Sequence, residues 1–162
     1  MLLYLMRHGE AEALGKGAAA KDSDRALTPK GRKRAKRTGQ ALRRIGHVPA
    51  LVVSSPHARA MQTAEIVVAA MKHRRAVVVR RDLATASSLV AVAEDILASG
   101  EKSVMLVGHE PTMSELARAL SGGDAWGNSF TKGMVLVLRW EKGSGATPLF
   151  RVTEGRTVAE FH

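Results

Sequence analysis

The sequence predicts an α/β fold, a three-layer α/β/α sandwich whose central sheet is mainly parallel. Short apolar runs alternate with amphipathic segments of helix length over the first two-thirds of the chain, as in parallel sheets covered by helices on both faces. The last third holds two apolar runs joined by a glycine-rich segment, which predicts an antiparallel hairpin. With 162 residues and no visible repeat or linker, the chain is expected to form a single domain, residues 1–162.

The first predicted strand, Leu2–Met6, is an apolar run that ends abruptly at Arg7, His8 and Gly9. In α/β sheets the functional site lies just past the carboxyl ends of the strands, so this triplet is a candidate reaction centre. The next segment, Ala11–Asp24, contains glycines and an alanine run and is expected to form a loop that could flank the site.

A helix is predicted after Thr28, which can act as the N-cap for Pro29 at the first helical position, and Gly46 can end it. Apolar residues at helical spacing give this helix one buried face. The other face, called the Lys30–Arg37 face below, carries four cations: Lys30, Lys33, Arg34 and Arg37. It is either a solvated surface or a docking patch for an anionic partner.

The second strand is predicted at Leu51–Ser54, and Ser55 followed by Pro56 repeats the signal for the start of a helix. Arg59 falls on the first turn of that helix. Its predicted buried residues are Ala60, Ala64, Val67 and Met71.

Four further elements continue the alternation. A strand is predicted at Ala76–Val79, a helix at about Ser88–Ala98, and a strand at Ser103–Gly108, which ends at His109. Pro111 then opens another helix.

The segment Ser121–Gly133 is rich in glycine and polar residues but holds Trp126 and Phe130. It is therefore either a plain connector or a lip over a site. Two strands, Met134–Trp140 and Leu149–Val152, are predicted beyond it as the closing hairpin.

Composition narrows the classes of function. The chain has 45% hydrophobic and 25% charged residues, as globular proteins do, and it has no Cys, which excludes disulfides, thiolate metal sites and cysteine nucleophiles. Neither a secretory signal nor a membrane-spanning segment is visible, so a cytoplasmic location and no membrane partner are expected. The net charge of +10 favours anionic partners, whereas an aromatic content of 4% argues against single-stranded nucleic acid.

Polar residues of one kind follow three of the predicted strands: Arg7 and His8 after the first, Arg59 after the second, and His109 after the fourth. The carboxyl ends of parallel strands meet at one edge of a sheet, so these side chains can converge on one pocket. Two guanidinium groups suit the oxygens of a phosphoryl group. His8 is the candidate nucleophile, because neutral imidazole can attack phosphorus and Gly9 allows close backbone approach there. His109 would donate to a phosphoryl oxygen.

Four sequence blocks resemble, in the same order, the motifs of the histidine phosphatase superfamily, formerly the phosphoglycerate mutase and acid phosphatase group. The blocks are Leu5–Glu10 (LMRHGE), Arg25–Gly31 (RALTPKG), Ser54–Ala64 (SSPHARAMQTA) and Leu106–Pro111 (LVGHEP). The resemblance covers nearly the whole chain, and its small size without inserts is most similar to the SixA-type phosphohistidine phosphatases. It implies the phosphoglycerate mutase-like fold.

The resemblance also implies a covalent phosphohistidine on His8, without a metal or another cofactor. The phosphate pocket that it implies consists of Arg7, Gly9, Arg59 and His109. Arg25 matches a position where SixA-like proteins carry arginine beside the pocket. Capping of the helix that follows, or a surface ion pair, would explain Arg25 equally well.

The general acid that protonates the leaving group departs from the family pattern. Larger branches supply a glutamate after the third strand, where this sequence has Thr85, and the acid phosphatase branch has an aspartate after its second histidine, where this sequence has Glu110. Glu110 either protonates the leaving group or lies at a helix N-terminus because the dipole favours an anion there. A missing acid matters least for a phosphoramidate, whose imidazole can already be protonated. That favours phosphohistidine over alkyl phosphates.

Three functions remain open at this point. The first is a phosphatase of a phosphorylated protein, such as a phosphotransfer protein with an acidic face, acting through phospho-His8. The second is a phosphatase of a small phosphorylated substrate, either a phosphate ester or a nucleotide. The third is a non-catalytic module that binds a phosphorylated or nucleic-acid partner through the pocket or the Lys30–Arg37 face. The complete pair of histidines argues against the third, since a pure binder needs no nucleophile.

Overall fold

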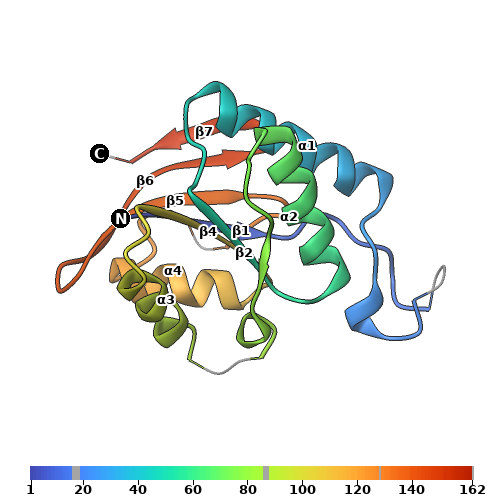
Figure 1. Cartoon of the computed structure of the whole chain (residues 1–162), viewed down its shortest axis with the longest axis horizontal. Coiled ribbons are helices and arrows are strands. Elements are labelled where there is room, and N and C mark those ends of the chain that lie inside the picture. The colour runs from blue at the N-terminus through green and yellow to red at the C-terminus, as the bar shows by residue number, and fades with distance from the viewer. Residues whose placement is uncertain (16–18, 86–87, 128, 162) are drawn as a thin grey trace.

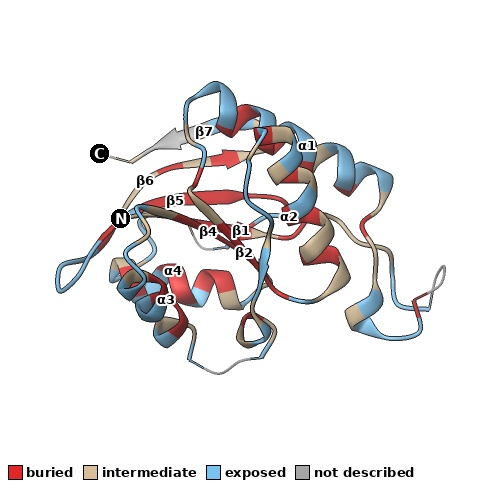
Figure 2. Cartoon of the chain, in the orientation of Figure 1, coloured by how far each residue is buried: buried red, intermediate tan, exposed pale blue. Residues whose placement is uncertain are grey.

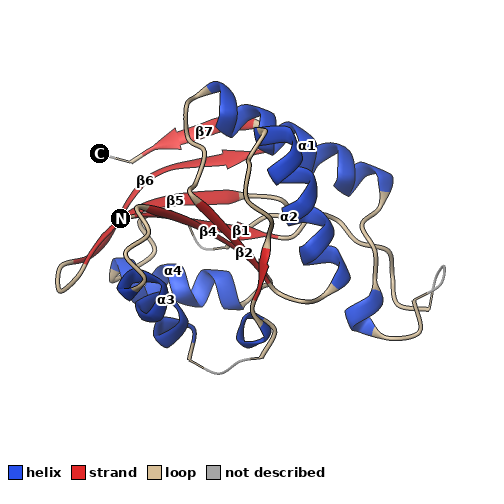
Figure 3. Cartoon of the chain, in the orientation of Figure 1, coloured by secondary structure: helices blue, strands red, loops and turns tan. Residues whose placement is uncertain are grey.

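The computed structural model describes the chain except for residues 16–18, 86–87, 128 and 162 and the side chains of residues 158–160. The described strands are β1 (Leu2–Arg7), β2 (Leu51–Ser54), β3 (Val78–Val79), β4 (Ser103–Gly108), β5 (Val135–Glu141), β6 (Gly145–Thr153) and β7 (Arg156–Glu160). The helices are α1 (Pro29–Arg44), α2 (Ala58–Met71), α3 (Leu89–Ala98) and α4 (Thr112–Ser121), with short 3-10 turns η1 (Asp22–Asp24) and η2 (Arg81–Leu83). Figures 1 and 3 show a central sheet between two pairs of helices, which confirms the predicted α/β/α sandwich.

The strand order of the sheet is β3-β2-β4-β1-β5-β6-β7. The first four strands in this order are parallel, and β5, β6 and β7 extend the sheet with antiparallel pairs. Arg7 at the end of β1 lies opposite Gly108 at the end of β4, and Ser54 at the end of β2 lies opposite Val107. The three parallel strands therefore end together, and the residues that follow them leave the sheet at one edge.

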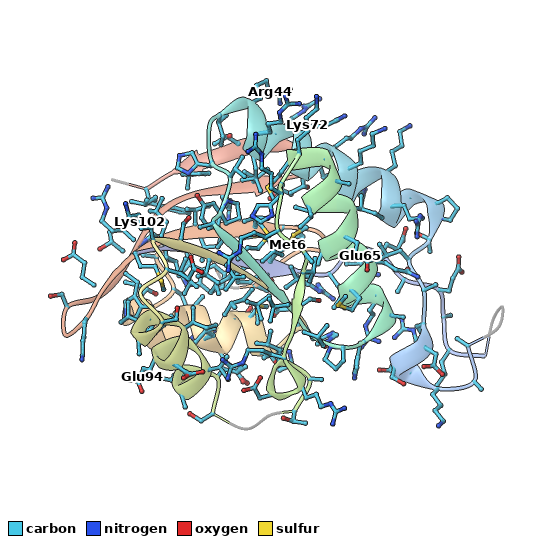
Figure 4. The ribbon with its side chains drawn as sticks, in the orientation of Figure 1. Met6, Arg44, Glu65, Lys72, Glu94 and Lys102 are labelled. Carbon is cyan, nitrogen blue, oxygen red and sulfur yellow. The ribbon has the colours of Figure 1, made fainter. Side chains whose placement is uncertain are left out.

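The two faces of the sheet bury separate apolar clusters, because successive strand residues point to opposite sides. Leu3 and Leu5 of β1 pack in the cluster that includes α3 and α4, whereas Tyr4 and Met6 pack in the cluster that includes α1 and α2. Figure 2 shows this burial on the strands and inner helix faces, and Figure 4 shows Met6 on the sheet beneath α2. No helix in the described part of the chain is both long and apolar enough to cross a membrane.

The closing hairpin is confirmed, but β7 was not predicted and β6 starts four residues before the predicted strand. β7 is an edge strand whose sequence is mostly polar, so its pattern is weak. The start of β6 was missed because it contains Gly145 and Pro148, two residue types that are unfavourable in strands. Pro148 pairs beside a register shift in β5, where the ladder tolerates a residue without an N–H.

Two other boundaries were also wrong. The third strand shrinks to Val78–Val79, an exposed edge pair, because only these residues pair with β2. The second helix begins at Ala58 with His57 as its N-cap residue, rather than directly after Ser55 and Pro56. The hydroxyl of Ser55 accepts from the N–H of His57 and also contacts His109, the residue that follows β4.

Helices α1 and α2 approach each other closely at Gly39. A Cβ added at this glycine would lie 2.7 Å from both the Cβ of Ala70 and the carbonyl oxygen of Val67 on α2. The interior of the protein has no room for such an atom without a shift of one helix. Gly39 is thus the residue that sets the spacing of this helix pair.

Replacing Gly39 by Ala should lower the free energy of unfolding by about 1–3 kcal/mol, the usual effect of overpacking. Helix propensity alone predicts the opposite sign, because Ala is favoured over Gly by about 1 kcal/mol. Gly123→Ala is the control, since an added Cβ there meets nothing within 4 Å. Urea unfolding of both variants measures the difference, and a stabilised Gly39→Ala protein would contradict the packing described here.

Candidate active site

His8, the first residue after β1, is held in one tautomer by two hydrogen bonds. Its Nδ1 lies 2.6 Å from the carbonyl oxygen of Gly9, and because a carbonyl only accepts, Nδ1 carries the ring proton. Its Nε2 accepts from the Nε–H of Arg59 at 3.3 Å, so the lone pair is on Nε2. Both contacts specify the same neutral imidazole, with Nε2 as its basic nitrogen.

The surroundings of His8 also keep the imidazole uncharged. The side chain is 8% exposed, and this burial is the main cause that lowers its pKa to about 4. The hydrogen bond to Gly9 raises the pKa, whereas the positive charges of Arg59, Arg7 and Arg25 lower it. At neutral pH the ring therefore holds one proton, on Nδ1, and one lone pair, on Nε2.

His109 follows β4 and lies beside His8, with 5.2 Å between their ring centroids. Its Nε2 is 2.7 Å from the hydroxyl oxygen of Ser55, a fully buried residue that also accepts from the N–H of His57 at 3.3 Å. The Nδ1 of His109 is buried and has no hydrogen-bond partner among the described residues. Burial is again the main cause that lowers its pKa, to about 3, so this ring is neutral too.

Arg59, in the first turn of α2 and 7% exposed, meets a carboxylate that the sequence analysis did not single out. Its guanidinium donates to the carbonyl oxygen of Asp22 at 2.8 Å and to the carboxylate of Asp22 at 3.1 Å. The other carboxylate oxygen of Asp22 pairs with Arg25 at 2.9 Å. The hydrogen bond from Arg25 is the main cause that lowers the pKa of Asp22. Asp22 thus bridges two arginines of the candidate site.

Arg25 forms the surface ion pair with Asp22, one of the alternatives that the sequence left open. It also donates from Nε to the carbonyl oxygen of Glu12 at 2.7 Å. Its positive charge helps to lower the pKa of His8. Asp22 and Glu12 both belong to the predicted loop 11–24, of which residues 16–18 are outside the described part.

Arg7 is held by the segment that precedes β5. One guanidinium nitrogen donates to the carbonyl oxygen of Phe130 at 2.8 Å, and its Nε is buried without a partner among the described residues. Phe130 and Trp126 pack in the core beside α4. The segment Ser121–Gly133 therefore does more than connect two elements, because it anchors Arg7 through a backbone oxygen.

Gly9 orients its neighbours. Its carbonyl oxygen holds Nδ1 of His8, and its N–H donates to the hydroxyl of Thr63 at 3.0 Å, so this N–H is engaged rather than open for the predicted phosphate contact. The hydroxyl of Thr63 in turn donates to the carbonyl oxygen of Arg59 at 2.7 Å. A Cβ at Gly9 would lie 3.2 Å from the carbonyl oxygen of Gly31, so the close approach that glycine allows is to α1.

Glu110 lies next to α4. One of its carboxylate oxygens accepts from the hydroxyl of Ser114 at 2.6 Å, and the other is buried without a partner among the described residues. Glu110 therefore lies at the N-terminus of α4, where the helix dipole favours an anion, one of the two alternatives given for it above. Thr85, the other position considered for an acid, is exposed and donates to the carbonyl oxygen of Asp82 at 3.5 Å.

Four residues of this site were not assigned a site role from the sequence: Asp22, Ser55, His57 and Thr63. The ring of His57 lies 4.8 Å from that of His109, and burial lowers its pKa. Three histidines thus lie together, yet no group of His, Asp or Glu side chains among the described residues is arranged to hold a metal ion. The arrangement offers cationic donors and neutral imidazoles, which suits an anionic group with a tetrahedral centre.

Comparison with known proteins agrees with this chemistry. Residues 3–88 match the family model of the histidine phosphatase superfamily (branch 1). The chain is 38% identical over 128 residues to an uncharacterized protein of Picosynechococcus sp., covering 76% of this chain and 74% of that protein. Its structure is similar to that of the protein histidine phosphatase SixA complexed with tungstate, with a TM-score of 0.84, 25% identity, and coverage of 95% and 97% of the two chains. It shares its fold with the alpha-ribazole phosphatase from Shigella flexneri, at 19% identity, a TM-score of 0.72 and coverage of 99% and 100%.

The low pKa values of His8 and His109 make stability depend on pH. The ordinary pKa is 6.5, and those of the folded protein are about 4 and about 3, so below pH 6.5 the unfolded chain binds protons that the folded chain does not. The free energy of unfolding should therefore fall as the pH drops from 6.5 to 4, by up to about 3 kcal/mol for His8. Denaturant unfolding across this range measures it. His8→Asn should flatten the dependence, and an equally steep slope in that variant would contradict the assignment.

Proposed function

This chain belongs to the histidine phosphatase superfamily (branch 1), and from that premise we propose that it is a metal-independent phosphatase that forms a phosphohistidine on His8. The observation that carries the proposal is the neutral ring of His8, with its proton held on Nδ1 by Gly9 and its lone pair on Nε2. Such a ring can attack phosphorus at neutral pH without a base to activate it.

In the first step, Nε2 of His8 forms a bond to phosphorus while the bond from phosphorus to the leaving group breaks. Positive charge develops on the imidazole, and the hydrogen bond from Nδ1 to the carbonyl oxygen of Gly9 stabilises it. Arg7 and Arg59 stabilise the negative charge on the phosphoryl oxygens. Arg59 already donates to Nε2 of His8, which places its guanidinium beside the atom that accepts the phosphoryl group.

His109 takes the role of a donor to a phosphoryl oxygen, and Ser55 holds its ring in place. The hydroxyl oxygen of Ser55 lies 2.7 Å from Nε2 of His109 and also accepts from the N–H of His57. A hydroxyl has one proton and two lone pairs, so this contact fixes the position of the ring whichever of the two groups donates. Ser55 is in this way a positioning residue for His109.

In the second step, a water oxygen bonds to phosphorus, the bond between phosphorus and Nε2 of His8 breaks, and inorganic phosphate leaves. One proton of the water passes to a phosphoryl oxygen, so the product is dihydrogen phosphate. The electron pair of the broken bond stays on Nε2, which returns the imidazole to the neutral form that its surroundings favour. The same arginines stabilise the phosphoryl oxygens in both steps. Catalysis therefore depends on fixed charges and on the tautomer of His8, both set before substrate binds.

The proposed substrate is a protein phosphohistidine. Similarity to the protein histidine phosphatase SixA supports this choice over a small phosphate ester. The leaving group supports it too. The carboxylate of Glu110, the candidate general acid, accepts a hydrogen bond from Ser114 of α4. An imidazole leaving group needs no such acid, because it can leave already protonated. The partner is thus a phosphorylated protein.

Replacing His8 by Ala should abolish turnover, because the variant lacks the atom that accepts the phosphoryl group. Wild type quenched during turnover of a labelled phosphohistidine peptide, with chelator present, should retain label that survives alkali and is lost in acid. The variant should retain none. Arg59→Ala should lower the rate by about 10²–10³, as removal of a charge-stabilising donor does.

Normal turnover by His8→Ala would contradict the mechanism, as would activity that the chelator removes. A substrate panel run beside it compares the phosphohistidine peptide with alkyl and aryl phosphates. Strong preference for an alkyl phosphate would replace the proposed substrate with a small ester while leaving the intermediate intact.

Replacing Ser55 by Ala should lower kcat by about tenfold to a hundredfold with little change in KM, because His109 loses the contact that holds its ring in place. The shifts of the ring nitrogens of His109 in nitrogen-15 spectra report the loss of this contact at Nε2. Ser54→Ala is the matched control, since Ser54 is equally buried but donates to the carbonyl oxygen of Ser55. If the ring shifts and kcat of Ser55→Ala equal those of wild type, Ser55 does not position His109.

A further inference from the structure

Helix α1 has a charge distribution that its own stability does not explain. Its 16 residues include eight Lys and Arg side chains and no carboxylate, within a chain whose net charge is +10. Like charges three and four residues apart destabilise a helix, and cations in its first turn oppose its dipole. Sequences depart from such local rules mainly where function requires it. The charge of α1 therefore points to an anionic partner.

The cations of α1 form one wall of a groove. Its volume is about 640 Å³, and its other wall is the turn between β6 and β7. The cations that line it are Lys30, Lys33, Arg34, Arg37, Arg44 and Arg156. One carboxylate, Glu154, lines it as well and pairs with Arg34 at 2.8 Å, which leaves a large excess of positive charge. We call this feature the basic groove.

The walls of the basic groove are fixed against each other. Gly155 in the turn lies against Arg37 so closely that an added Cβ would be 2.8 Å from the Cβ of that arginine. The ion pair between Arg34 and Glu154 joins the same two walls. A partner therefore meets a preformed surface rather than a set of independent side chains.

The basic groove begins beside the candidate active site. Lys30 is in the first turn of α1, and the preceding N-cap, Thr28, donates from its backbone N–H to the carbonyl oxygen of Glu10 at 2.9 Å. Glu10 is two residues from His8. The lining residues on α1 run from Lys30 to Arg44, a length of about 20 Å at 1.5 Å per residue. Figure 4 labels Arg44 at the end of this helix.

We propose that the basic groove is the docking surface for an acidic face of the phosphorylated protein whose phosphohistidine enters the pocket. This proposal rests on the proposed function. Lys30, Lys33, Arg34 and Arg37 have the i, i+3, i+4, i+7 spacing of one helix face, which matches carboxylates spaced in the same way on a partner helix. Such charge complementarity raises the association rate and fixes the orientation of the partner.

An acidic protein fits the basic groove better than nucleic acid does. The described residues that line it include no aromatic side chain on which a base could stack. The groove also leads to a pocket whose proposed substrate is a phosphorylated protein side chain. Binding of nucleic acid is the rival outcome that the experiment below separates.

The test compares two helical peptides of about 20 residues, each with one phosphohistidine near its end. One carries four Glu residues at i, i+3, i+4 and i+7, and the other has Gln in their place. Phosphoramidate serves as a substrate too small to reach the groove. The variant is Lys33→Glu with Arg37→Glu, both exposed, and the matched control is Lys102→Glu with Lys142→Glu, which are exposed and outside the groove.

Wild type should hydrolyse the Glu peptide with a kcat/KM about tenfold above that of the Gln peptide at low salt, and the difference should shrink as salt is added. The groove variant should lose this preference and retain hydrolysis of phosphoramidate. The control variant should keep both. An equal kcat/KM for the two peptides in wild type, or a groove variant that keeps the preference, would overturn the proposal.

Fluorescence anisotropy with the unphosphorylated peptides keeps this test separate from the proposed function. If wild type hydrolyses none of the three substrates, the proposed function fails, and the groove is still judged by whether the Glu peptide binds wild type at least tenfold more tightly than the groove variant. A DNA duplex of about 20 base pairs is titrated in parallel. Tighter binding of the duplex than of the Glu peptide would assign the groove to nucleic acid and overturn the proposal.

Discussion

The parallel pairing of β1 with β4 is the constraint on which the candidate active site depends. Because Arg7 lies opposite Gly108, the next residues of the two strands, His8 and His109, leave the sheet side by side with ring centroids 5.2 Å apart. A shift of one residue in this register would turn the side chains of one strand to the opposite face. β2 pairs with the other side of β4 and brings Ser55 to the same place by the same geometry.

Hydrogen bonds to neutral atoms, more than contacts between charges, set the chemistry of this site. A backbone oxygen decides which nitrogen of His8 holds the proton, and the hydroxyl of Ser55 contacts Nε2 of His109. Burial lowers the pKa of both rings, so neither depends on a particular pH near neutrality for its neutral form. The arginines are therefore the cationic groups of the site, because the histidines beside them carry no charge of their own.

The sequence predicted the parts of the fold that local pattern and topology determine. Apolar periodicity located β1, β2 and β4, and the rule that parallel strands end together brought Arg7, His8 and His109 to one edge. Apolar periodicity did not locate β7, because a strand at the edge of the sheet needs few apolar residues. It also failed for Asp22, because a carboxylate in a glycine-rich loop has no sequence signal that ties it to an arginine 37 positions away. Ser55 was noticed in the sequence as a signal for the start of a helix. Its role as a partner of His109 could not be predicted, because serine is common in both positions.

The carboxylate of Asp22 pairs with both Arg25 and Arg59 in this structure. Under the proposed mechanism, a phosphoryl group that enters the site would therefore exchange one anion for another at Arg59. The same exchange would run in reverse when inorganic phosphate leaves, with Asp22 returning to the arginine. A single exposed residue of a 3-10 turn would then act on both the entry and the exit of phosphate.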